Sequence, residues 1–122
     1  MRKRTITMLA ATAGLIGSGL AMAPSAQAAP SGCSSGALCA YALANYAGGT
    51  PQRVWEDNAD LTQYGYFYYI QGGSLYNNGN SCNVNVYTGK SGTGSGFKLN
   101  RGTGWANIGS NLPHISSNYW CR

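Results

Sequence analysis

The chain has 122 residues, of which 43% are hydrophobic and only 9% are charged, and its formal net charge is +5. A chain of this length has room for one domain built around one hydrophobic core. Beyond the N-terminus its basic residues are scattered and form no clustered basic face, so we exclude nucleic acid as a partner.

The first 28 residues predict a removable signal peptide. Basic residues 2–4 precede a mostly apolar stretch over residues 5–22, and the small-residue pattern Ala26-Gln27-Ala28 follows. A translocase recognises charge followed by hydrophobicity, and the signal peptidase needs small side chains at the cut. We therefore expect a secreted, extracellular domain of residues 29–122 with no membrane association after cleavage. That part keeps five basic and three acidic residues, a net charge of +2.

All four cysteines, Cys33, Cys39, Cys82 and Cys121, lie in the predicted mature part. An even cysteine count in a short exported chain indicates disulfides. Three pairings are open, and the spacing favours a local Cys33–Cys39 clip, which leaves Cys82 to pair with Cys121. A bond that closes about 40 residues would contribute roughly 4 kcal/mol in the chain-entropy model. Zinc is disfavoured because there is no C-x2-C pair and only His114 could join the cysteines.

Short strands separated by turns rich in glycine and asparagine are predicted along the mature part. In chain order the predicted strands are Ala37–Ala42, Gln52–Glu56, Tyr66–Ile70, Ser74–Tyr76, Asn83–Tyr87, Gly96–Leu99 and Ile115–Trp120. Apolar residues alternate at 84 and 86 and again at 97 and 99, as is typical of half-buried strands. Residues 42–47 are expected to form a loop.

A duplication divides the domain into two units, at about residues 33–80 and 81–122. Aromatic, glycine and serine positions recur in both units: Tyr41, Tyr46, Gly48 and Ser74 in the first, and Tyr87, Gly92, Gly94 and Ser117 in the second. Two units of about four strands each indicate paired Greek keys, packed as an all-β sandwich.

These positions resemble the βγ-crystallin Greek-key signature, in which two aromatic residues five apart are followed by a glycine. Tyr41, Tyr46 and Gly48 match it in full, whereas Gly92 replaces the second aromatic of the second unit, where a weaker corner is expected. The aromatic rings stack under a folded hairpin, and the glycine adopts the positive φ of the turn. The resemblance implies that the serine closing each unit ties this hairpin by a hydrogen bond.

The mature chain as a whole is similar to the secreted bacterial metalloproteinase inhibitors of peptidase inhibitor family thirty-six. The similarity rests on the segment Cys33–Tyr41, the corner Asn45–Gly49, the run Leu75–Asn78, the following Cys82 and the second unit. It implies a monomeric, disulfide-stabilised βγ-crystallin-like sandwich that inhibits an extracellular peptidase, a metallopeptidase, by binding. The alternatives are an extracellular carbohydrate or cell-wall glycan binding module, and a small antimicrobial or toxin-like protein of the same fold.

Calcium-binding βγ-crystallins close each unit with Asn/Asp-Asn/Asp-x-x-Ser/Thr-Ser, which supplies the oxygen ligands that calcium prefers. The ligand positions here hold Tyr69, Ile70 and Gly73 in the first unit, and Leu112, Pro113 and Ser116 in the second. We therefore expect no cofactor and no metal, and weak calcium binding is disfavoured.

Catalysis is not expected of this chain. Glu56 and Asp57 are adjacent, so their side chains would point to opposite faces of a strand instead of into one cleft. No motif ties the single histidine, His114, to a nucleophile or an acid. Oxidised cysteines are not available as nucleophiles.

The segment Tyr64–Tyr69 is the richest candidate for binding, since tyrosine suits interfaces. As a strand it would place Phe67 and Tyr69 on one face and Tyr66 and Tyr68 on the other, and one face must be buried. The predicted binding surface is Tyr64, Tyr66, Tyr68 and Lys90.

Two loops, the Cys33–Cys39 clip and the glycine-rich hairpin 89–96, are further candidates for contact with a partner. Trp55, Trp105 and Trp120 are expected to be packing residues, because a small domain needs large apolar side chains in its core.

Overall fold

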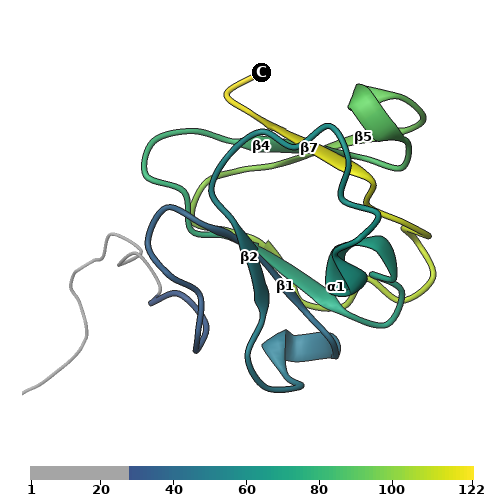
Figure 1. The fold of residues 1–122 in the computed structure, drawn as a ribbon. Coiled ribbons are helices and arrows are strands. Elements are labelled where there is room, and N and C mark those ends of the chain that lie inside the picture. The colour runs from purple at the N-terminus through teal and green to yellow at the C-terminus, as the bar shows by residue number, and fades with distance from the viewer. Residues whose placement is uncertain (1–27) are drawn as a thin grey trace, which may run out of the picture.

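The computed structural model describes residues 28–122; residues 1–27, which hold all but the last residue of the predicted signal peptide, lie outside the described part. Two β-sheets face each other in a sandwich (Figure 1). The first has the strand order β2-β1-β3-β6 and the second β5-β4-β7. The strands are β1 Leu38–Tyr41, β2 Gln52–Val54, β3 Ser74–Asn77, β4 Val84–Tyr87, β5 Gly96–Leu99, β6 Gly104–Trp105 and β7 Ser117–Trp120.

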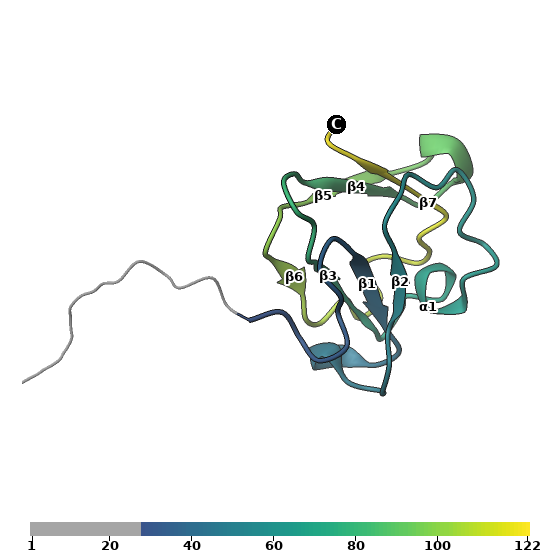
Figure 2. The same cartoon turned by 60° about the vertical axis from the view of Figure 1, so that its left-hand side comes forward.

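All strand pairs are antiparallel, and each sheet makes backbone contact with a segment from the other half of the chain. The two-residue strand β6 joins the first sheet beside β3, with Trp105 opposite Leu75. In the opposite direction, Asn58 forms a bridge to Asn118 of β7 in the second sheet. The exchange is visible in Figure 2, where β6 lies at the end of the first sheet and below β5. The two halves therefore share one core.

The core lies between the sheets and is formed by aliphatic and aromatic side chains from both. Its buried members are Leu38, Ala40, Val54, Leu61, Phe67, Ile70, Leu75, Val84, Val86, Leu99, Ile108, Leu112 and Ile115. Burying each of these larger side chains stabilises the fold by about 1.5–3 kcal/mol, which is the main favourable contribution in a domain of this size.

The predicted strand Tyr66–Ile70 is wrong: this segment contains the single helical turn α1, Gly65–Tyr68. The backbone N–H groups of Phe67 and Tyr68 both donate to Tyr64 O, at 3.0 and 2.8 Å. Residues that pack against the core recur every third position, at Leu61, the partly buried Tyr64, Phe67 and Ile70, a spacing that suits a turn and not a strand. As a consequence Phe67 is buried, whereas Tyr69 is 70% exposed, so the predicted pairing of these two side chains on one face does not occur.

The strand β6 was not predicted, because two residues carry no readable alternation. Residues 42–47, expected as a loop, contain the 3₁₀ turn η3, Ala44–Tyr46, whose Asn45 and Tyr46 both have a φ of 59°. Its counterpart in the second half is η4, Lys90–Gly92, in which Ser91 has a φ of 55°.

Both disulfides have the pairing that the spacing favours, Cys33 with Cys39 and Cys82 with Cys121. The first closes a clip that packs against the outer face of the first sheet, where Cys39, Tyr41 and Tyr76 are buried. The second ties β7 back to the segment that joins the two halves. No free cysteine remains in residues 28–122.

Each hairpin corner is tied by one buried serine. Ser74 Oγ accepts a hydrogen bond from the Tyr46 N–H at 2.9 Å and donates to Leu43 O at 2.7 Å. Ser117 Oγ accepts from the Gly92 N–H at 3.0 Å and donates to Gly89 O at 2.7 Å. Both hydroxyls thus satisfy backbone groups that the folded hairpins leave unpaired.

The aromatic packing differs between the two corners. In the first, Tyr46 lies edge-on between Tyr41 and Tyr76, at ring-centroid distances of 5.5 and 5.8 Å. Burial raises the pKa of both Tyr41 and Tyr46, and the Tyr41 hydroxyl donates to Ser31 O at 2.9 Å. In the second corner the middle ring is missing, and Tyr87 and Tyr119 contact each other directly at 6.0 Å.

Candidate functional site

The predicted binding surface of Tyr64, Tyr66, Tyr68 and Lys90 does not form one patch. Tyr64 packs edge-on against the buried Phe67 at 6.3 Å. Tyr66 is 36% exposed, and Tyr68 stacks on His114 with ring centroids 4.3 Å apart. Lys90 lies in η4 beside the second sheet, whereas α1 packs beside the first (Figure 1). The prediction therefore mixed residues from different parts of the molecule.

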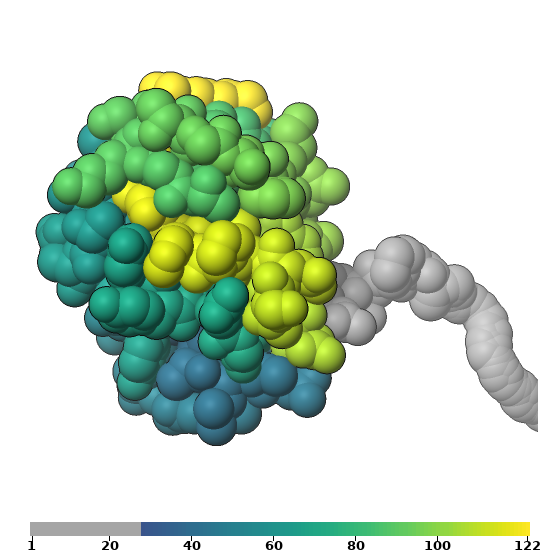
Figure 3. Space-filling view, turned by 90° about the vertical axis from the view of Figure 1, so that its right-hand side faces the viewer, coloured from purple at the N-terminus to yellow at the C-terminus, as the bar shows by residue number. Residues whose placement is uncertain are grey.

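The exposed tyrosines around α1 form a cluster and not a flat platform. Tyr69 meets Tyr68 at an interplanar angle of 75°. Figure 3 shows this face, where residues of the α1 region lie against residues numbered in the 110s. The rings of Tyr68 and Tyr69 therefore present separate faces instead of one plane.

His114 contacts a backbone carbonyl and an aromatic ring. Its Nδ1 lies 2.9 Å from Tyr68 O, so Nδ1 carries the hydrogen and donates it to this carbonyl. No group of three or more His, Cys, Asp and Glu side chains gathers in the described chain. Ile70 and Leu112, which stand where calcium ligands would lie, are buried in the core.

The two loops proposed from the sequence are both well ordered by hydrogen bonds or packing. The Cys33–Cys39 clip is mostly buried and serves as a cover for the first sheet. In the hairpin 89–96, the Ser91 N–H donates to Ala59 O at 2.8 Å, and Lys90 pairs with Asp60 at 3.5 Å. The hydroxyl and the backbone N–H of Thr62 lower the pKa of Asp60 by donating to its Oδ1, and Lys90 lowers it further.

A surface that the sequence analysis missed lies where the two halves of the chain join. Here the segment Asn78–Cys82, which we call the junction loop, runs beside Trp55 and ends at the Cys82–Cys121 disulfide, and the three border a shallow pocket of about 340 Å³. We call the residues Trp55, Asn80 and Ser81, with this disulfide, the junction surface. Trp55 is 52% exposed, so the expectation that it is a packing residue is wrong. Trp105 and Trp120 do pack against the core, as expected.

Hydrogen bonds and the disulfide hold both ends of the junction loop. At the near end, Asn78 O accepts from the Gly36 N–H at 2.8 Å and the Asn78 N–H donates to Ala37 O at 2.9 Å. The side-chain amide of Asn78 adds a bond to Cys33 O at 3.0 Å. At the far end the chain is fixed by the Cys82–Cys121 bond. Only the middle, Asn80 and Ser81, is exposed, so the loop is displayed without being free to move far.

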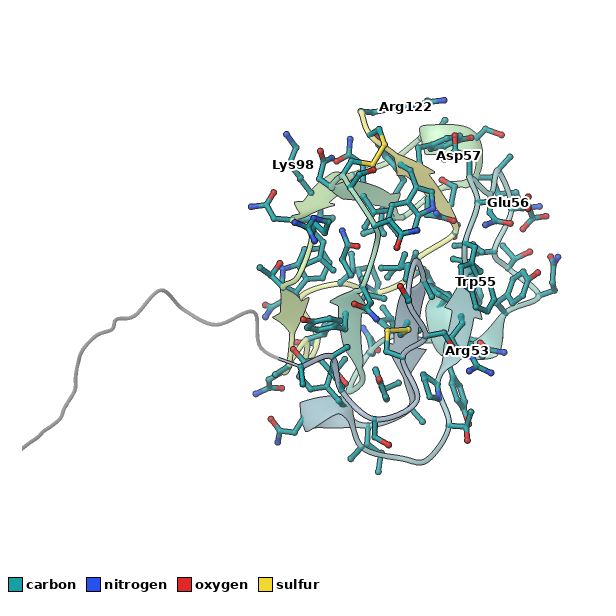
Figure 4. The ribbon with its side chains drawn as sticks, turned by 90° about the vertical axis from the view of Figure 1, so that its left-hand side faces the viewer. Arg53, Trp55, Glu56, Asp57, Lys98 and Arg122 are labelled. Carbon is teal, nitrogen blue, oxygen red and sulfur yellow. A yellow bond between two sulfur atoms is a disulfide. The ribbon has the colours of Figure 1, made fainter. Side chains whose placement is uncertain are left out.

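Trp55 is held in place beside this loop. Its Nε1 donates to Ser35 O at 3.2 Å, and the hydroxyl of Ser35 donates to Asn80 Oδ1 at 3.3 Å. Figure 4 shows Trp55, Glu56 and Asp57 following one another along the same side of the molecule. Asp57 Oδ1 accepts from the Trp120 N–H at 2.8 Å, so this carboxylate also fixes the end of β7. The arrangement is a rigid aromatic anchor beside a constrained loop, which is a combination suited to protein binding.

Little in the sequence pointed to this surface. Cys82 follows the turn signal Asn77-Asn78-Gly79 closely, so a constrained loop could have been inferred there. The exposure of Trp55 depends on the end of β2 at Val54, two residues before the predicted strand end. No helix in residues 28–122 is long and apolar enough to cross a membrane.

The fold is that of βγ-crystallin domains. A βγ-crystallin domain solved in a study of the evolution of the eye lens fold has 17% identity, covers 76% of this chain and 93% of its own, and superposes with a TM-score of 0.60. A βγ-crystallin from Ciona intestinalis has 20% identity over 70% of this chain and all of its own, with a TM-score of 0.55. IPSE alpha-1, an IgE-binding crystallin, has 19% identity over 75% of this chain and 87% of its own, with a TM-score of 0.57. These identities show a shared fold only.

At the level of sequence, no curated protein matches the chain. A family profile does match, over residues 26–99, which is more than half of the chain and includes the clip, the first corner and the junction loop. That profile describes peptidase inhibitor family I36, and the chain belongs to this family.

Proposed function

We propose that this protein is exported, cleaved after Ala28, and inhibits extracellular metallopeptidases by docking the junction surface onto the target. The observation that carries the docking proposal is the junction loop itself, exposed at Asn80 and Ser81 and held at both ends. Membership of a peptidase inhibitor family supports a peptidase as the partner. The metallopeptidase class and export are inferred from the resemblance and from residues 1–28.

The physical basis of inhibition would be preorganisation. A flexible loop loses conformational entropy when it enters a cleft, at about 0.5–1.5 kcal/mol for each ordered side chain. The Asn78 hydrogen bonds and the Cys82–Cys121 bond impose most of that order before binding. Trp55 then supplies a large ring whose orientation is already fixed by Ser35. Binding of this kind needs no catalytic group on the inhibitor.

The test uses the oxidised protein collected from the medium of an exporting host, titrated against a thermolysin-type metallopeptidase. We expect stoichiometric inhibition, and a measured mass equal to that of a chain that begins at Ala29. Trp55→Ala should raise the inhibition constant at least tenfold, as removal of a central aromatic anchor usually does. Leu43→Ala is the matched control, since Leu43 is 56% exposed but lies in the corner of the first half; it should leave the constant within twofold.

Two outcomes would contradict the proposal. Absence of inhibition at high molar excess, together with retention on cell-wall glycan, would favour the binding-module alternative. Inhibition that is unchanged in Trp55→Ala and in Asn80→Ala would show that the protein docks through another surface.

A further inference from the structure

A second surface, on the other side of the molecule, has features that the proposed inhibition does not use. The strand β5 is the edge of the second sheet and pairs with β4 on one side only. Gly96, Phe97 and Lys98 in this strand are all exposed. An edge strand presents unpaired backbone N–H and C=O groups, to which another extended chain can hydrogen-bond.

An apolar pocket lies directly beside this edge. Phe97 is opposite Val86 in the sheet, so its ring is on the core-facing side, yet it is 40% exposed. The pocket has a volume of about 280 Å³, enough for one large aliphatic or aromatic side chain. Its lining is Phe97, Trp105, Ile108 and Leu112, with Asn107 and Asn111. Figure 2 shows β5 and β6 at the same side of the sandwich, and the pocket lining includes Phe97 of β5 and Trp105 of β6.

In the first half of the chain, the strand position equivalent to Phe97 is covered by other residues. The register places Gln52 opposite Ala40, as Phe97 is placed opposite Val86. Gln52 Oε1 accepts a hydrogen bond from the Tyr66 N–H at 2.6 Å, so α1 covers this corner. In the second half a larger apolar residue stands at this position beside an open pocket. Of these two equivalent strand positions, Gln52 is covered by α1, whereas Phe97 is left beside an open pocket.

Charge indicates what kind of partner fits. All three side-chain carboxylates of the described chain lie within residues 56–60, and residues 81–122 contain no Asp or Glu. Lys90 pairs with Asp60 at 3.5 Å and Arg122 approaches Asp57 at 4.0 Å. In residues 28–122 this leaves Arg53, Lys98 and Arg101 without a carboxylate partner, and only Lys98 and Arg101 lie in the second half of the chain. Figure 4 shows Lys98 at the opposite edge of the molecule from Glu56 and Asp57. Two copies paired through β5 would bring like charges together, whereas an acidic segment would not.

From these observations we propose that the free edge of β5 binds an extended acidic peptide segment of a partner protein. The segment adds a strand beside β5, places one large apolar side chain in the pocket under Phe97, and pairs its carboxylates with Lys98 and Arg101. Strand addition of this kind gives affinity through the backbone and specificity through the pocket. The site is separate from the junction surface, so it stands or falls independently of the inhibitor proposal.

The probe is the peptide Ac-Glu-Val-Leu-Val-Glu-NH2, titrated into the oxidised, exported protein labelled with ¹⁵N. We expect amide shift changes that cluster at residues 96–99 and around Trp105 and Leu112. A peptide in which alanine replaces leucine should bind about tenfold more weakly, because the pocket stays empty. A peptide N-methylated on the residues that pair with β5 should bind the wild-type protein at least fivefold more weakly. It lacks the N–H groups that would donate hydrogen bonds to β5.

Variants of the protein then test the same contacts from the other side. Phe97→Ala should weaken the leucine peptide about tenfold and the alanine peptide little. Lys98→Glu with Arg101→Glu should weaken both peptides and reverse their salt dependence, because salt then screens repulsion instead of attraction. Leu43→Ala is the control and should change neither. No binding at millimolar peptide, shift changes elsewhere, or equal binding of the N-methylated peptide would overturn the proposal. The proposal would also be overturned if the amide shifts of β5 changed with protein concentration in the absence of peptide. That result would identify a second copy of this chain as the occupant.

Discussion

The serine ties at the two hairpin corners allow a prediction worked directly from the structure. Ser74 and Ser117 are fully buried, and each hydroxyl makes two hydrogen bonds to backbone groups of its hairpin, at 2.7–3.0 Å. Replacement by alanine removes both bonds and leaves one N–H and one C=O unpaired. At about 1 kcal/mol for each bond, either variant should lose about 2 kcal/mol of unfolding free energy, or about 10 °C in Tm.

The assay is urea unfolding of the oxidised protein, followed by tryptophan fluorescence, with hydrogen exchange as a local readout. Ser74→Ala should accelerate exchange of the Tyr46 amide, and Ser117→Ala that of the Gly92 amide, each without the other. Ser110→Ala, at an exposed serine, is the matched control and should change stability by less than 0.5 kcal/mol. A loss below 0.5 kcal/mol in both buried-serine variants would refute the reasoning, as would unchanged exchange at the two amides.

Three further predictions concern other parts of the scaffold. Replacing Cys82 and Cys121 together by alanine should lower the unfolding free energy by about 4 kcal/mol, because the unfolded chain regains the freedom of a 39-residue loop; urea unfolding measures it, and a loss under 1 kcal/mol would contradict it. Tyr46→Ala should cost about 2–4 kcal/mol by the same measurement, since it removes the ring that packs edge-on against two others, and an unchanged midpoint would contradict that packing role. The pKa of Asp60 is lowered by Thr62, so the folded state favours its charged form; this stability is present above the usual carboxyl range of about 4 and is lost as the pH falls through the folded pKa. Asp60→Asn should therefore be less stable than the unmodified protein at pH 7 and equally stable at pH 2, and a difference that persists at pH 2 would contradict this assignment.

Much of the fold was predictable because its determinants are short-range. Four cysteines in a short chain led to the two bonds, since a spacing of six residues favours a local clip. Alternation at Val84 and Val86 predicted β4, and the structure places both in the core. The aromatic, glycine and serine spacing indicated the sandwich, which the comparison with βγ-crystallin domains supports.

The binding surface was not predictable in the same way. We interpreted the tyrosine segment with a period of two, although Leu61, Tyr64, Phe67 and Ile70 recur every third residue and all pack against the core. Local composition also suggested that Trp55 would be packed, because its neighbours in sequence do not reveal that β2 ends before it. Grouping Lys90 with the tyrosines failed because the two belong to elements that pack beside different sheets.

The sequence by itself thus determined the disulfide-stapled, duplicated β-sandwich, because residue spacing and periodicity are local properties of the chain. The inhibitor family followed from the resemblance of its motifs to that family, which the family profile bears out. Only the tertiary structure decided what is exposed. Three features depend on contacts between residues far apart in sequence: the exchange of β6 and Asn58 between the halves, the junction loop held beside Trp55, and the open pocket beside Phe97. Local pattern sets which residues can turn or pair, but burial is a property of the packed molecule, and it is burial that separates a core side chain from one that is free to bind.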